Sequence, residues 1–101
     1  MDNLTSQALV VKTARESALT ARVEYLTEEL NLKKEKGLRA ITIKDSNPKA
    51  TVQVIEATLG QEFEDKDKAL LTKEEAWKRL EIEAEYQDDI LTILKLTYKP
   101  A

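Results

Sequence analysis

The densest group of reactive side chains in this sequence is a set of carboxylates in its C-terminal third. Glu81, Glu85 and Asp88 are spaced four and three residues apart, so a helix would place them on one side, beside Glu83 and Asp89. Paired carboxylates of this kind can hold a hard cation or act as general acid and base. No histidine or cysteine is present to complete such a site.

A structural role is the stronger interpretation of these carboxylates. Arg15 and Arg22 lie seven residues apart and interrupt the apolar face of the N-terminal segment. Their stems can cover apolar surface while their guanidinium groups reach carboxylates at its border. We therefore expect the acidic set to be a solvated helix face or the partner of these two arginines across an interface.

Motifs for catalysis and cofactor binding are missing from the sequence. Asp65-Lys66-Asp67 begins like a calcium loop, but Leu70 stands where that loop requires glycine. Gly37 and Gly60 are the only glycines, so no glycine-rich phosphate loop can form, and no histidine is present to activate a serine. We expect no enzyme, no cofactor and no metal site.

Basic residues concentrate near the middle of the chain. Residues 33–49 carry a net charge of +4, whereas residues 1–32 and 50–101 carry −2 and −5. Such a cluster can bind phosphates, or it can complement the C-terminal dipole of a helix and keep a loop soluble. We favour the second interpretation because the cluster contains no aromatic residue for base stacking. This basic cluster comprises Lys33, Lys34, Lys36, Arg39, Lys44 and Lys49.

Helical periodicity predicts an all-α fold in a single domain of residues 1–101. Two long helices, of about residues 5–36 and 66–98, are expected to form an antiparallel hairpin with a short helix of about residues 48–59 in the connector. A chain of this size buries only roughly 60 to 70% of its unfolded surface. We therefore expect the hairpin to assemble into a helical oligomer.

The connector allows two interpretations. Gly37 offers a left-handed stop for the first helix, and Asp45-Ser46-Asn47-Pro48 is a start signal for a short helix that Gly60 would end. β-branched residues in the first part of the connector instead favour an extended segment. The competing interpretation pairs residues 40–44 with residues 51–55 as a β-hairpin.

The two long helices should meet along apolar faces. The last helix begins at Asp65 or Asp67, or restarts at the capping box formed by Thr72 and Glu75. One of its apolar rows has the seven-residue phase typical of a coiled-coil seam: Leu70, Trp77, Leu80, Ala84, Leu91, Leu94 and Tyr98. The matching face of the first helix is predicted to contain Leu4, Ala8, Val11, Ala14, Ala18, Ala21, Tyr25, Leu26 and Leu30, flanked by Leu19 and Val23.

A second apolar row lies on the opposite side of the last helix. At 100° per residue, Ile82, Tyr86, Ile93 and Leu96 point away from the Ala84 direction. The short helix, roughly 18 Å long, cannot cover this row. We expect these four residues to be an interface, with a second copy of the chain or with another protein.

The sequence also predicts a cytoplasmic location. No run approaches the roughly 18 apolar residues that span a bilayer, and Met1-Asp2-Asn3 lacks the basic flank and apolar block of a signal peptide. The absence of cysteine fits a reducing compartment. We expect no membrane partner.

The order of these elements resembles small helical proteins encoded by bacteriophages, including those of the recombination-mediator type. A long helix, a basic turn, a short Asn-Pro helix and an acidic link come first, and the last helix carries Trp77, Leu80, Ala84, Tyr86, Leu91 and Leu94. The resemblance spans most of the chain. It implies a non-enzymatic oligomer that helps to load or organise a recombinase on single-stranded DNA. This chain differs in being acidic overall, so a protein partner is favoured over nucleic acid.

Overall fold

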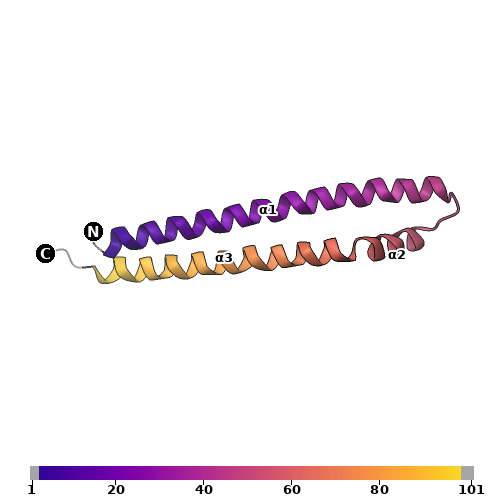
Figure 1. Ribbon diagram of the computed structural model, residues 1–101. Helices are drawn as coiled ribbons and strands as arrows, with labels where there is room; N and C mark the ends of the chain where they lie inside the picture. Colours follow the sequence, from indigo (N-terminus) through magenta and orange to yellow (C-terminus); the bar gives the residue numbers. More distant parts are fainter. Residues whose placement is uncertain (1–2, 99–101) are drawn as a thin grey trace.

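The computed structural model describes residues 3–98, which form three helices and no strand. The helices are α1, Asn3–Ser46, α2, Val52–Glu62, and α3, Glu64–Thr97. α1 lies antiparallel to α2 and α3, which follow one another along its length, so the start of α1 and the end of α3 lie at the same end (Figure 1). The molecule measures 79 × 17 × 16 Å. The predicted all-α helical hairpin is thus confirmed.

α1 is longer than predicted because Gly37 does not end it. No glycine in the described chain has a positive φ, and a Cβ at Gly37 would meet nothing within 4 Å, so this glycine is an ordinary helical residue. The next residues are helical too, and the Thr42 hydroxyl donates to the Leu38 carbonyl at 3.1 Å. The cost of a mid-helix glycine, about 1 kcal/mol, is offset because α1 still has α2 beside it.

The connector is a tight turn, so the β-hairpin interpretation of residues 40–44 and 51–55 is wrong. The Ala50 amide donates to the Asn47 carbonyl at 2.9 Å, and the Lys44 ammonium donates to the Ala50 carbonyl at 2.8 Å. α2 begins at Val52 rather than at residue 48, because the Thr51 side chain accepts from the Val54 amide and caps the helix. The short helix itself is confirmed, with a later start.

α2 runs almost directly into α3, so the predicted stop at Gly60 is also wrong. Phe63 alone separates the two helices, and its amide donates to the Leu59 carbonyl at 2.9 Å while its carbonyl accepts from Asp67 at 2.8 Å. Its ring is buried and holds the bend against α1. Thr72 lies inside α3, which therefore does not restart at the capping box.

The seam between α1 and α3 follows most of both predicted faces, and on α1 it departs from the prediction mainly after Tyr25. Ala84 and Leu91 are buried, as are Val11 and Leu32 on α1. Predicted seam residues that are instead exposed are Ala8, Leu26, Leu30, Leu80 and Tyr98. The α1 seam includes partly buried Glu28 at helical spacing from Tyr25 and Leu32, and Glu28 forms an ion pair with Lys73 of α3. A charged seam residue of this kind gives no apolar signal, which is why the prediction chose the neighbouring leucines.

Candidate interaction surfaces

The second row of α3 lies on the outside of the hairpin. Ile82, Tyr86, Ile93 and Leu96 are 65, 58, 59 and 81% exposed, whereas Ala84 between them is buried against α1. The helical period thus separates a covered side of α3 from an uncovered one. We call Ile82, Tyr86, Ile93 and Leu96 the α3 row.

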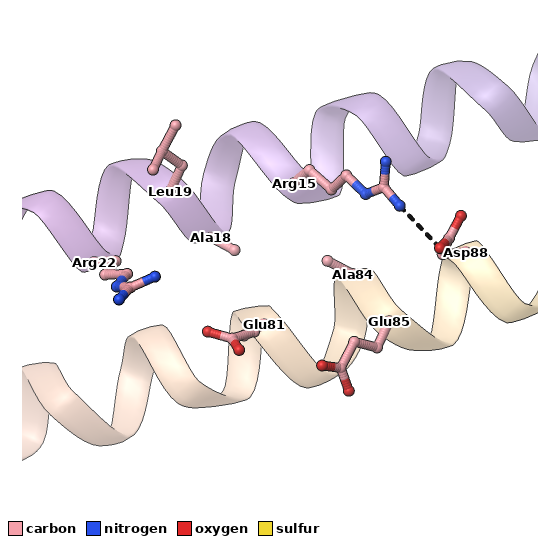
Figure 2. Close-up of a pocket in the computed structure, with 8 residues that line it drawn as sticks. All are labelled: Arg15, Ala18, Leu19, Arg22, Glu81, Ala84, Glu85 and Asp88. Atoms are coloured by element: carbon pink, nitrogen blue, oxygen red, sulfur yellow. Dashed lines mark ion pairs between the residues drawn. The ribbon is translucent and has the colours of Figure 1, made fainter.

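The carboxylates of α3 face the arginines of α1 within the same chain. Arg15 reaches across to Asp88, with its Nη2 2.8 Å from Oδ2, at the edge of a hollow of about 260 Å³ (Figure 2). Arg22 lies over the Trp77 ring instead, with its guanidinium carbon 5.6 Å from the ring centroid. Glu81 lines the same hollow. The structure therefore gives part of the acidic set a structural partner.

This acidic set does not assemble a cation site in the structure. Among residues 3–98, no group of three or more His, Cys, Asp or Glu side chains converges as metal ligands would. Successive carboxylates of α3 are spread along the hollow, with Ala84 between Glu81 and Glu85 (Figure 2). Within the described chain, the ion pair that this face forms is Arg15–Asp88.

Much of the basic cluster is paired at the turn end of the hairpin. Lys36 Nζ is 2.6 Å from Asp67 Oδ1. Arg39 makes two bonds of 2.8 Å to the Glu62 carboxylate, which lower the pKa of Glu62 and raise that of Arg39. Such two-point pairing is the strong form of this interaction.

The other members of the cluster divide into paired and unpaired cations. Lys33 Nζ lies 3.7 Å from Glu29 Oε1, and Lys44 donates to the Ala50 carbonyl. Lys34 and Lys49 form no ion pair within the described chain. Carboxylates thus neutralise three of the six cations, and the local charge available to a phosphate is smaller than the sequence indicates.

A polar network at the middle of the hairpin was not predicted. The Tyr25 hydroxyl donates to Glu29 at 2.6 Å, with Glu74 at 3.1 Å as a second acceptor, and these hydrogen bonds raise the pKa of Tyr25. The pKa of Glu74 is lowered, first by Lys78 and then by Tyr25. The Tyr25 and Trp77 rings lie 6.2 Å apart. Nothing in the spacing of these residues distinguishes them from ordinary seam positions.

Small seam residues leave a second hollow on the hairpin, which the sequence analysis also missed. It has a volume of about 440 Å³ and is bordered by Leu9, Val10, Ala14 and Leu80, with Gln87 at its rim. The Gln87 backbone carbonyl and side-chain oxygen accept from Gln7 at 2.8 and 2.9 Å. Alanine on α1 could have signalled a gap, but its position relative to α3 depends on the register of the two helices.

A further apolar row lies on the outer side of α1. Leu19, Val23, Leu26 and Leu30 are 61, 54, 42 and 66% exposed. The prediction placed two of them in the seam and two at its border. We call these four residues the α1 row.

Comparison with known proteins gives no relative from which a role could be transferred. No protein-family model, curated protein or solved structure matches this chain. Within residues 3–98, no helix combines the length and apolar character needed to cross a membrane. The functional inference therefore depends on the surfaces described above.

Proposed function

We propose that this chain is a non-enzymatic helical oligomerisation and adaptor protein that acts through protein–protein contacts, with the α3 row as its main contact face. The exposure of Ile82, Tyr86, Ile93 and Leu96 carries this proposal. Four large apolar side chains along one helix face form a surface that soluble chains usually cover with another protein surface.

The balance of buried and exposed apolar residues supports the same proposal. Among the described residues, six apolar side chains are buried and seventeen large ones are exposed. Two helices side by side can each hide only one narrow face, so the hairpin has no further surface with which to cover the rest. A second chain packed on α3 would cover the α3 row.

The acidic charge of α3 explains how such a face remains selective. Glu83, Glu85 and Asp89 stand beside the α3 row in the sequence, and a partner must match or avoid them. Charged residues that border an apolar interface set its orientation and partner choice more than its strength. A second copy of the chain, or a protein with basic residues at the right positions, would satisfy this requirement.

The proposal is tested by measuring the molar mass of the wild-type chain and of the Ile82→Glu/Ile93→Glu variant by light scattering. The wild type is expected at a multiple of 11.5 kDa and the variant at a lower mass, with helix content unchanged by circular dichroism. Burying unpaired glutamates in the contact would cost several kcal/mol.

Thr92→Glu is the control, since it adds a glutamate to an exposed position next to Ile93 but off the α3 row. It should keep the wild-type mass. A double variant with wild-type mass and full helix content would overturn the α3 row as the contact face.

A further inference from the structure

The α1 row has a spacing that distinguishes it from scattered surface residues. Leu19, Val23, Leu26 and Leu30 follow one another at intervals of four, three and four residues. This spacing keeps all four on one stripe of the helix, about 17 Å long. Ala18, Ala21 and Tyr25, which face α3, lie on a different side. The α1 row is therefore a second seam with no helix packed on it in the described chain.

This stripe is complementary to itself when a second copy runs in the opposite direction. Its midpoint falls between residues 24 and 25, so a two-fold axis there places Leu19 level with Leu30 of the second copy. The same axis places Val23 level with Leu26 of the second copy. Each layer then contains one residue from each chain, which is how antiparallel helices interdigitate.

The charges beyond the two ends of the stripe favour this direction. Glu16 precedes the α1 row by three residues, and Lys34 follows it by four. Both lie on the same flank of the stripe, and the two-fold axis brings Glu16 to within one residue's rise of Lys34 of the second copy. Parallel copies would instead place Glu16 beside Arg15 and Lys34 beside Lys33 of the second copy, and both of these already have carboxylate partners in their own hairpins.

These two charges are available for a partner. Neither Glu16 nor Lys34 forms an ion pair within residues 3–98. On the opposite flank Arg15 would approach Lys33 of the second copy, but each is already neutralised in its own hairpin, by Asp88 at 2.8 Å and by Glu29 at 3.7 Å. The attractive pairs therefore decide the direction.

We infer that a second copy of this chain docks antiparallel on the α1 row, with Glu16 of each copy facing Lys34 of the other. This contact goes beyond the proposed function, because it lies on the other long helix and does not require the α3 row. A seam of four residues per chain is small, so the dimer should be weak, with a dissociation constant of roughly micromolar order.

A charge-exchange experiment tests the contact in the Ile82→Glu/Ile93→Glu background, where the α3 row is disabled. Sedimentation equilibrium should show a monomer–dimer mixture. Glu16→Lys or Lys34→Glu alone should raise the dissociation constant by about three- to tenfold at low salt, since each replaces two attractive pairs by two repulsive ones. The double exchange should restore it, and an equimolar mixture of the two single variants should form a mixed dimer.

The control variants separate this contact from general effects of charge. Leu26→Glu should abolish the dimer, whereas Asn31→Glu, which adds the same charge to an exposed position off the stripe, should leave it intact. If the background chain loses helix content, the same charge exchanges are made in the wild-type chain. The measurement is then whether the two single variants form a mixed dimer.

Three results would overturn the inference. A background chain that is monomeric at all concentrations would remove the contact, while the α3 row would still be judged by the loss of mass from the wild type. A dimer that persists but ignores both charge exchanges, or one that Leu26→Glu leaves unchanged, would contradict the antiparallel register.

Discussion

The two ends of the hairpin are held together by different means. At the turn end, ion pairs connect α1 with α2 and α3: Lys36–Asp67, Arg39–Glu62, Lys66–Glu35 and Lys73–Glu28. At the open end, Arg15–Asp88 is the one ion pair between helices among the described residues, and the seam is lined with alanine.

Exposed apolar side chains occur in both halves, and those of the turn half include Leu38, Ile41, Val52, Val54 and Leu71. The α3 row lies wholly in the open half, and the α1 row extends from the open half into the middle of the molecule. The two halves thus differ in the number of ion pairs between helices, and the open half carries the α3 row, which it can offer to another chain. This difference is the basis of the proposed assembly.

The largest effect on stability is expected when one buried leucine in each half of the hairpin is truncated. Leu32 and Leu91 are both 8% exposed, so Leu32→Ala and Leu91→Ala form a matched pair. Each should lower the free energy of unfolding by about 2–4 kcal/mol, measured by urea denaturation. Native-state hydrogen exchange should show that Leu91→Ala opens the open end first. Equal loss of protection along the whole rod after Leu91→Ala would contradict the contrast between the two ends.

Leu32 and Glu28 also show where sequence reasoning reached its limit. The helical period placed the α3 seam correctly except at Leu80 and Tyr98, and it separated that seam from the outward-facing α3 row. It also placed most of the α1 seam up to Tyr25, but it failed beyond that point, where the residue that faces α3 between Tyr25 and Leu32 is a glutamate whose charge is matched by Lys73. Such a pair becomes visible only when the register of the two helices is known.

The helix ends teach a similar lesson about local signals. Glycine is a common residue at helix ends, yet Gly37 and Gly60 both lie inside helices because neighbouring helices continue beside them. Asp45-Ser46-Asn47-Pro48 was predicted to start the short helix, but in the structure α1 continues to Ser46 and α2 begins only at Val52, so Pro48 lies in the turn between them. A glycine only permits an end, whereas a proline removes a hydrogen bond.

Acid should weaken the turn end next. The pKa of Glu62 is lowered in the folded chain by Arg39, so its stabilising effect is present above its ordinary pKa of 4.5 and is lost as the pH falls through the folded value. Thermal melting followed by circular dichroism should therefore show a falling Tm below about pH 4.5. Glu62→Gln should lower the Tm at neutral pH and flatten this decline. An acid decline of the same size in Glu62→Gln would contradict the role of the pair.

Alkali should act at the middle of the hairpin, through Tyr25. The pKa of Tyr25 is raised above the ordinary value of 10.0 by the hydrogen bond to Glu29. Its contribution to the stability of the fold is therefore fully present below pH 10 and is lost as the pH rises toward the pKa of the folded chain. Phenolate absorbance should show a titration step above pH 10, and Tyr25→Phe should remove that step. A titration curve in which Tyr25→Phe removes no such step would show that the network is absent in solution.

The smallest effect is expected from nucleic acid. Because carboxylates neutralise Lys33, Lys36 and Arg39, single-stranded DNA should bind weakly, with an affinity that changes little between two salt concentrations. Fluorescence anisotropy measures this directly. A steep salt dependence that disappears after Lys34→Glu would instead assign a phosphate-binding role to the basic cluster.

The molar mass of the wild-type chain, measured by light scattering over a range of concentrations, tests the central claim most directly. An open end that requires another chain predicts a mass above 11.5 kDa that rises with concentration and falls in the Ile82→Glu/Ile93→Glu variant. A mass of 11.5 kDa at every concentration, with full helix content, would contradict it.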